Sequence, residues 1–251
     1  MVKLSAVLIT YNEASVIERT LRALQWCDEI VVVDSGSTDD TVLQCEQCGC
    51  RVVYRPFDGY GPQKRFAVAQ AQHDWILSID ADEVVTDDLR KEIQQWLAKE
   101  PIYQGFLLPR SLVFMDKRLR FGGQYKAPIL RLFHRQYGHF NANQVHESIE
   151  LNGKTRTLQN QLLHYSYAST EAYFERFNAY TSAGARELHA KGKKSNKLHI
   201  FLRFPASFFS IYILKGCVFD GYPGFVWALF SALYPVVKYV KLRELRAREA
   251  Q

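Results

Sequence analysis

The first hundred residues alternate between short apolar runs and segments with helical spacing. Four runs of mainly β-branched and apolar residues have the pattern of buried strands: 4–10, 30–34, 52–54 and 75–80. Between and after them, apolar residues recur every three or four positions and predict helices: 14–24, a segment after Ser37 and Thr38, 62–71 and 87–97. Alternation of this kind predicts an α/β fold, a Rossmann-type, mostly parallel sheet with helices on both faces.

The regular alternation stops near residue 101. Short strands are expected at 105–108, 129–133, 145–149 and 162–165, and residues 170–190 have the spacing of a long helix. We therefore expect one α/β domain in two halves, residues 1–100 and 101–168, followed by a helical extension at 169–251.

The extension carries two uncharged stretches, residues 204–214 and 221–237, and prolines interrupt the second. A spanning helix needs about 20 apolar residues. Cations flank both stretches: Arg186, Lys191, Lys193, Lys194, Lys197 and Arg203 before, and Lys238, Lys241, Arg243, Arg246 and Arg248 after. Apolar segments edged by cations suit peripheral attachment to an anionic membrane surface. The simpler alternative is a buried helical hairpin with a solvated, charged end.

Composition narrows the choice of partner. The chain has 251 residues, 47% of them hydrophobic, with a formal net charge of +6 and a pI of about 9.0. This balance favours an anionic partner, such as a nucleotide, a nucleic acid or an acidic membrane. The basic clusters flank apolar segments and do not interleave with aromatic residues in an RNA-binding motif, so we expect no nucleic acid.

Polar residues follow the predicted strands where ligands of parallel sheets bind, at the carboxyl ends. These are Thr10, Tyr11 and Glu13 after the first strand, Asp34 after the second, and Asp80, Asp82 and Glu83 after the fourth. Three carboxylates so close together require a cation to offset their charge. The chain lacks a G-x-G-x-x-G fingerprint, a P-loop, an H-E-x-x-H motif and a G-x-S-x-G elbow, so those chemistries are excluded.

The remaining interpretation uses the strand ends together. Asp34 would accept a hydrogen bond from the imide of a uracil, and Tyr11 would pack against the base. Asp80 and Asp82 would hold a divalent cation, Mg²⁺ or Mn²⁺, that bridges a diphosphate, because hard cations prefer oxygen ligands. Lys64 and Arg65, on the helix before the last strand, would meet phosphate or balance the carboxylates. A metal-bound diphosphate is a good leaving group, which is the chemistry of sugar transfer.

Three segments of the first hundred residues resemble one family. "ITYNEASVIERTLRAL", "VVVDSGSTDDT" and "WILSIDADE" are similar, in order and spacing, to the N-terminal signature of family 2 glycosyltransferases of the GT-A fold. Farther on, "LRLFHR", "VHESIE", "LLHYSY" and "LKGCVFDGYPG" resemble the bacterial lipopolysaccharide-core glucosyltransferases of the WaaE/KdtX type. The resemblance covers nearly the whole chain.

The resemblance implies a metal-dependent, inverting transfer of a hexose, typically glucose from UDP-glucose, onto an inner-core heptose of lipopolysaccharide. It also implies a cytoplasmic enzyme, attached peripherally to the cytoplasmic face of the inner membrane. Residues 1–100 would bind the nucleotide sugar and residues 101–168 the acceptor. The chain departs from the family in two motifs. Lys64-Arg65 stands where many members have Arg-Asn, and the Glu-Asp base motif of many members has its best counterpart here in Glu147.

An inverting transfer needs a base for the acceptor hydroxyl, and a carboxylate is well suited. Glu147 in "VHESIE" is the best candidate, with His146 as the rival base or as the residue that orients Glu147. Arg131 and Arg135 are weaker candidates for contacts with an acceptor phosphate. His164 is interpreted as a core histidine.

Two alternatives stay open. The acceptor of a family 2 transferase can instead be a polyprenyl phosphate or a peptide cysteine. From another class, the chain would be a basic, peripheral membrane-binding module with an inactive transferase fold, although Asp34, Asp80 and Asp82 are all present.

Overall fold

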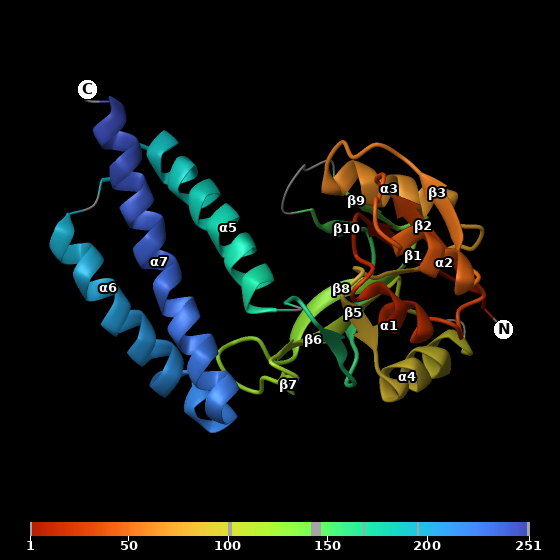
Figure 1. Cartoon of the computed structure of the whole chain (residues 1–251). Coiled ribbons are helices and arrows are strands. Elements are labelled where there is room, and N and C mark those ends of the chain that lie inside the picture. Colours follow the sequence, from red (N-terminus) through yellow and green to blue (C-terminus); the bar gives the residue numbers. More distant parts are fainter. Residues whose placement is uncertain (1, 100–101, 142–146, 168, 195, 250–251) are drawn as a thin grey trace. The chain divides into compact units, whose positions relative to one another are not determined.

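The computed structural model describes the whole chain except residues 1, 100–101, 142–146, 168, 195 and 250–251 (Figure 1). The chain forms two compact units. Unit 1 comprises Met1–Ser111 and Lys126–Ser166, and unit 2 comprises Leu112–Tyr125 and Tyr167–Gln251. Residues 112–125 thus belong with the C-terminal helices, which the sequence pattern did not indicate. The division of the α/β part into a donor half and an acceptor half stays a prediction.

A single large sheet organises unit 1, with the strand order β3-β2-β1-β4-β8-β6-β12-β5. The bounds in this order are Arg51–Tyr54, Glu29–Asp34, Leu4–Thr10, Trp75–Ser78, Ala127–His134, Gly105–Phe114, Leu162–His164 and Glu83–Val85. The first four strands are parallel, and β8 pairs antiparallel with both β4 and β6. β11 (Thr155–Thr157) and β7 (Lys117–Arg118) also pair with β6, while β9 (Gly138–Phe140) and β10 (Ile149–Leu151) form a separate ribbon.

Alternate residues of the parallel strands pack on opposite faces of the sheet. On one face, Leu8 and Val32 pack with α1 (Ile17–Arg22), α2 (Thr41–Gln47) and α4 (Asp87–Leu97). On the other face, Val7 and Val33 pack with α3 (Tyr60–Gln70) and with β9. Together with the family match reported below, this arrangement confirms the predicted α/β fold, a mostly parallel sheet with helices on both faces.

The structure differs from the predicted elements mainly after the fourth strand. β4 ends at Ser78, so Asp80 lies in the turn that leads to β5, a short strand that the pattern did not predict. The strand predicted over 145–149 falls partly outside the described residues, and the observed strand β10 begins at Ile149. β6 is ten residues long and continues from unit 1 into unit 2.

Unit 2 consists mainly of α5 (Thr170–Ala190), α6 (Lys197–Phe209) and α7 (Gly221–Glu249), and α7 packs against both of the others. A π-helical turn (Ser210–Leu214) and a 3₁₀ turn (Cys217–Asp220) join α6 to α7. Phe114, Leu119, Tyr173 and Val226 are central to its core, so the aromatic run of α5 contributes to packing.

Helix α7 runs through Pro235 for 29 residues, longer than the uncharged stretch that the sequence pattern indicated. By length and composition, the described helical segment Cys217–Arg248 is sufficient to cross a membrane. The length argument against a spanning helix therefore no longer holds, and peripheral attachment stays a prediction.

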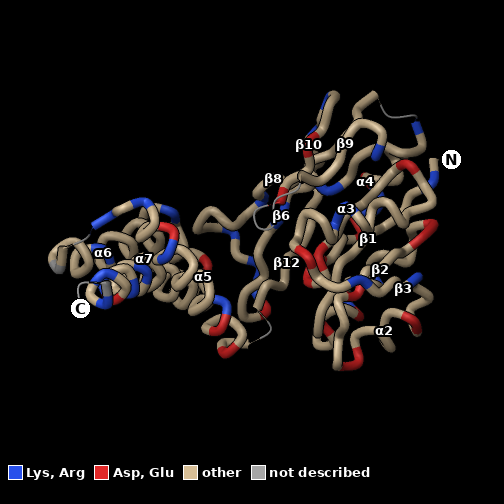
Figure 2. Tube along the Cα trace, turned by 90° about the horizontal axis from the view of Figure 1, so that it is seen from above, with Lys and Arg blue, Asp and Glu red and all other residues tan. Residues whose placement is uncertain are grey.

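The positive charge of the chain lies in unit 2. Unit 2 contains 16 lysines and arginines against 7 aspartates and glutamates, a net charge of +9, so the net charge of unit 1 is −3. In Figure 2 blue segments accordingly recur along α6 and α7.

Candidate functional site

Three parallel strands of unit 1 bring their following residues to one edge of the sheet. Thr10 pairs in register with Asp34, and Val7 with Ser78, so the residues after β1, β2 and β4 share the carboxyl edge. Tyr11 is 57% exposed at this edge. An exposed aromatic ring beside buried polar groups suits a planar ligand such as a base.

The carboxylate of Asp34 shapes the loop that follows β2. It is buried and accepts hydrogen bonds from the backbone N–H of Gly36 at 2.7 Å and of Ser37 at 2.9 Å, and from the Ser37 hydroxyl. The Ser37 hydroxyl oxygen in turn accepts the N–H of Asn12, which has a φ of 54°. A carboxylate has about four acceptor positions, so Asp34 retains capacity for one further donor.

Asn12 belongs to the polar run after the first strand, but the sequence pattern assigned no role to it. Its side-chain oxygen accepts the backbone N–H of Thr38 at 2.8 Å, and the backbone N–H of Glu13 bonds to the Thr41 hydroxyl at 2.8 Å. These contacts fasten the loop after β1 to the loop after β2. Asn tolerates a positive φ better than most residues, which is the one sequence signal for this role.

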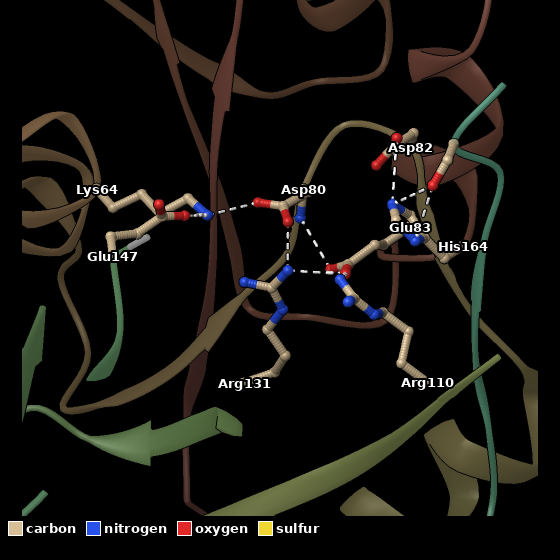
Figure 3. Close-up of polar contacts among 9 residues, drawn as sticks. Lys64, Asp80, Asp82, Glu83, Arg110, Arg131, Glu147 and His164 are labelled. Atoms are coloured by element: carbon tan, nitrogen blue, oxygen red, sulfur yellow. Dashed lines mark hydrogen bonds and ion pairs between the residues drawn. The ribbon is translucent and has the colours of Figure 1, made fainter. Parts of the chain in front are cut away.

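A buried lysine links two carboxylates that are distant in the sequence. Lys64 lies on the buried side of α3, and its Nζ is 2.7 Å from Asp80 Oδ1 and 2.7 Å from Glu147 Oε1 (Figure 3). The candidate base therefore lies beside the acidic turn after β4. Charge-assisted bonds of this kind are short and fix the position of both carboxylates.

A second cation holds the other side of the acidic turn. Arg131, on β8, has a side chain only 5% exposed, and its Nη2 contacts Asp80 Oδ2 and, at 2.7 Å, Glu83 Oε1 (Figure 3). Arg110 contacts the fully buried Glu83 at 3.3 Å. Lys64, Arg131 and Arg110 thus supply the positive charge that offsets the carboxylates of Asp80 and Glu83.

These contacts determine the ionisation of Asp80 and Arg131. Burial would raise the pKa of Asp80, but the charges of Arg131 and Lys64 and their hydrogen bonds outweigh it and hold that pKa well below its ordinary value. Burial would lower the pKa of Arg131, but Asp80 and Glu83 outweigh it and raise that pKa above its ordinary value. Both groups are therefore charged at neutral pH.

The remaining carboxylate faces a histidine. Asp82 Oδ2 is 3.4 Å from His164 Nε2, and the backbone N–H of Tyr165 donates to the Asp82 carbonyl oxygen at 2.8 Å (Figure 3). An oxygen and an imidazole nitrogen at this spacing suit one divalent cation between them. Sequence reasoning assigned His164 to the core, and no local signal contradicts that, because the two residues meet only through the pairing of β12 with β5.

The side chains around the acidic turn supply only part of the ligands that a divalent cation needs. Both oxygens of Asp80 are held by Lys64 and Arg131, whereas Asp82 and His164 lie together. Among the residues that the structure describes, no three His, Cys, Asp or Glu side chains gather closely enough to bind a metal on their own. A cation here would need further oxygens, such as those of a diphosphate.

Three predicted residues lie elsewhere or are committed to other contacts. Arg65 is exposed, and its Nε donates to the carbonyl oxygen of Phe140. Arg135 pairs with Asp74 at 2.9 Å, at the opposite end of β4 from Asp80. Arg131 is committed to buried ion pairs with Asp80 and Glu83. The predicted contact of either arginine with an acceptor phosphate stays a prediction. His146 lies outside the described residues.

Comparison with known proteins shows the family of the chain. The family model for glycosyl transferase family 2 matches residues 5–150. An uncharacterized glycosyltransferase of Rickettsia bellii is 34% identical over 97% of this chain and 87% of its own. The lipopolysaccharide core biosynthesis glycosyltransferase LpsC of Rhizobium meliloti is 29% identical over 99% of this chain and 94% of its own.

One solved structure resembles a part of the chain. Glucosyl-3-phosphoglycerate synthase of Mycobacterium tuberculosis, in complex with Mn²⁺, UDP and glucosyl-3-phosphoglycerate, is 27% identical over 44% of each chain, with a TM-score of 0.37. The family model, by contrast, covers more than half of this chain, including Asp34, Lys64, Asp80, Asp82 and Glu147. By that match and by the relatives that span nearly its whole length, the chain belongs to glycosyl transferase family 2.

Proposed function

We propose that this glycosyltransferase moves a hexose from a UDP-sugar, with inversion, onto a heptose of the inner core of lipopolysaccharide. The observation that carries the proposal is the contact of Lys64 with both Asp80 and Glu147, because it joins a donor-side carboxylate to a candidate base. The likeness to a lipopolysaccharide core glycosyltransferase over nearly the full length supports the class of acceptor.

Donor binding would use the loops after β1 and β2. Tyr11 stacks on the uracil, and Asp34 accepts the imide N–H at the acceptor position that its loop contacts leave. Thr10 and Glu13, at the same strand end, line the nucleotide side. Thr10 Oγ1 is buried and has no hydrogen-bond partner among the described residues, so it is available to the donor.

Asp82 and His164 would hold a divalent cation, Mg²⁺ or Mn²⁺. When bound, the cation neutralises charge that develops on the diphosphate as it leaves. Lys64 adds a second positive charge on the same side, and Asp80 positions Lys64 by the 2.7 Å contact. Arg131 keeps Asp80 and Glu83 in place without touching the donor.

Glu147 would act as the general base. As the acceptor hydroxyl oxygen bonds to the anomeric carbon, its proton passes to a Glu147 carboxylate oxygen and the bond from the anomeric carbon to the phosphate oxygen breaks. One displacement from the opposite face inverts the anomeric configuration. The enzyme would work on the cytoplasmic face of the inner membrane, held there peripherally by unit 2.

The test is incubation of the full-length protein with a panel of UDP-hexoses and of core acceptors truncated one sugar at a time. We expect one donor to give a product heavier by one hexose, with inverted configuration by NMR. Transfer to a polyprenyl phosphate or to a peptide cysteine would instead overturn the acceptor. Absence of turnover with every donor would favour an inactive fold that serves as a membrane-binding module.

Metal dependence is tested separately. EDTA should abolish transfer, and Mg²⁺ or Mn²⁺ should restore it. Asp82→Asn and His164→Ala should each raise the cation concentration needed for half-maximal rate, by about 10- to 100-fold as for other metal-site losses. Asp74→Asn, at the opposite edge of the sheet, is the matched control. Full activity in EDTA would leave Lys64 as the charge partner of the diphosphate.

A further inference from the structure

Helix α6 and its π-helical turn present apolar side chains outward. Leu198, Phe201, Leu202, Phe209 and Leu214 recur at helical spacing, and all are exposed. Phe201 is 76% exposed and Leu214 71% exposed. A helix on the surface of a soluble protein normally shows the reverse pattern, with its apolar face inward. We call this row of five side chains the outer stripe of α6.

A groove runs along the same helix and borders the outer stripe at Leu202. Its volume is about 490 Å³, and apolar Leu202, Ala206 and Ile211 line it together with His199, Arg203, Ser207, Ser210 and Lys215. The groove therefore offers a guanidinium, an ammonium, an imidazole and two hydroxyls. These groups form hydrogen bonds with phosphate oxygens. The π-helical turn lies at this point, and such turns are frequent at functional sites.

The cations of the groove lack the partners that cations of a solvated face usually have. Arg203 stacks on the ring of Tyr239 at 4.1 Å and donates to His199 Nε2 at 2.8 Å. Its Nε is buried and has no hydrogen-bond partner among the described residues. Within the described part of the chain, no carboxylate pairs with Arg203 or with Lys215. A buried donor without a partner is costly, so an anionic ligand would relieve it.

Lys241, another cation of unit 2, is used within the fold. Its Nζ is 2.6 Å from Asn178 Oδ1 and 2.8 Å from the hydroxyls of Thr181 and Ser182 on α5. That lysine stabilises the packing of α7 on α5. Lys241 is thus bound to oxygens of the neighbouring helix, whereas Arg203 and Lys215 in the groove of α6 have no such oxygen partners among the described residues.

We propose that α6 binds the phosphate headgroup of an anionic membrane lipid in this groove, with the outer stripe in the adjacent acyl layer. The inference rests on the proposed peripheral attachment to the membrane and names the element responsible. The net charge of +9 on unit 2 complements an anionic leaflet, and basic amphipathic helices with large apolar residues bind at that depth.

The test measures binding of the full-length protein to sedimented vesicles of phosphatidylglycerol mixed with phosphatidylcholine, and of phosphatidylcholine alone. We expect binding only to the anionic vesicles. Each cation near the surface contributes about fivefold to affinity, so Arg203→Gln/Lys215→Gln should bind about 25-fold more weakly. Phe201→Ser/Leu214→Ser, both at exposed positions, should also lose binding. The matched control Lys91→Gln/Lys99→Gln, exposed in unit 1, should bind like the wild type.

Every other outcome overturns the proposal. If the groove variants bind anionic vesicles as tightly as the wild type, the groove does not bind the anionic headgroup. If the wild type binds vesicles of phosphatidylcholine alone equally well, an anionic lipid is not required. A thermal shift with inorganic phosphate that Lys215→Gln abolishes, without vesicle binding, would indicate a free-phosphate site. A dimer dispersed by Phe201→Ser/Leu214→Ser, with vesicle binding unchanged, would assign the stripe to a second copy of the chain.

The same samples separate this proposal from the proposed function. UDP-sugar turnover by the groove variants, with acceptor dispersed in detergent, should remain within about twofold of the wild type because the catalytic residues lie in unit 1. Loss of vesicle binding with turnover retained supports the lipid site. Loss of turnover in the wild type would reject the proposed function and leave the vesicle result intact.

Discussion

The ammonium of Lys64 offsets the negative charge of two carboxylates in the site, those of Asp80 and Glu147. Lys64 lies 83 positions before Glu147 and 16 before Asp80, yet its ammonium contacts both carboxylates. The buried lysine between them, together with Arg131 on the far side of Asp80, shows that the acidic turn is an organised polar network.

Replacing the proposed base gives the sharpest kinetic test. Glu147→Gln keeps the side-chain shape but removes its basicity, and general-base catalysis typically contributes about 10² to 10⁴-fold. We expect kcat to fall by that factor with little change in the KM for the UDP-sugar, measured by steady-state kinetics.

Glu150→Gln is the matched control, because Glu150 lies three residues on in the exposed β10 strand and should have near-normal kinetics. A near-normal kcat in Glu147→Gln would show that the base lies elsewhere. His146→Ala would then be examined first.

Arg131 and Arg135 test how far burial decides the role of an arginine. Arg131→Met leaves the buried Glu83 with a weaker charge partner, so we expect the free energy of unfolding to fall by about 3–5 kcal/mol. Arg135→Met removes a partly exposed pair and should cost less than about 1 kcal/mol. Urea unfolding at neutral pH measures both. Equal effects would mean that Arg131 does not stabilise the acidic turn.

At the scale of elements, the segment "DGYPG" (residues 220–224) connects the hairpin of residues 112–125 to α7 by hydrogen bonds. The carboxylate of Asp220 is buried and accepts the backbone N–H of Arg120 and of Phe121 at 3.0 Å, and the Lys117 ammonium donates to the Asp220 carbonyl oxygen at 2.6 Å. Gly224 is required there, since a Cβ would lie 2.0 Å from the Cys217 carbonyl oxygen. This motif therefore organises unit 2.

Removing the Asp220 carboxylate should loosen unit 2. Asp220→Ala leaves two partly buried N–H groups without their acceptor, which costs about 1–3 kcal/mol. We expect a Tm lower by several degrees and faster hydrogen exchange at Arg120 and Phe121. Glu244→Ala, an exposed position on α7, is the control. Unchanged exchange at both amides would contradict this connecting role.

At the scale of the whole molecule, the two units differ in charge. The net charge is −3 for unit 1 and +9 for unit 2, so the overall +6 understates the basic character of the helices. This asymmetry favours attachment through unit 2 to an anionic surface. The proposed catalytic residues all lie in the other unit.

Cell fractionation tests the attachment. After lysis at low ionic strength we expect the protein to pellet with membranes, and about 1 M salt should release a substantial part of it, because the Debye length falls to about 3 Å. Immunoblots of pellet and supernatant measure the partition. Retention in the pellet through high salt and alkaline carbonate would show that α7 spans the membrane, and a soluble protein at low salt would contradict attachment altogether.

The order of strands and helices in the first hundred residues could be predicted from the sequence, because those elements follow from local periodicity. Asp34, Asp80 and Asp82 could be found in the same way, since each comes directly after an apolar run. The later strands were harder. β5, β7, β9 and β11 have only two or three residues each, too few for a period to be recognised.

Local pattern in this chain determined an α/β sheet, its acidic turn and the family motifs. Only the tertiary structure decided which charges meet: Lys64 rather than Arg65 at Asp80, Arg131 at Asp80 and Glu83, and His164 beside Asp82. The physical reason is that periodicity places a residue on a face of its own element, whereas an ion pair depends on the pairing of strands far apart in the chain. His164 meets Asp82 because β12 pairs with β5, a contact across about eighty residues that no local signal contains.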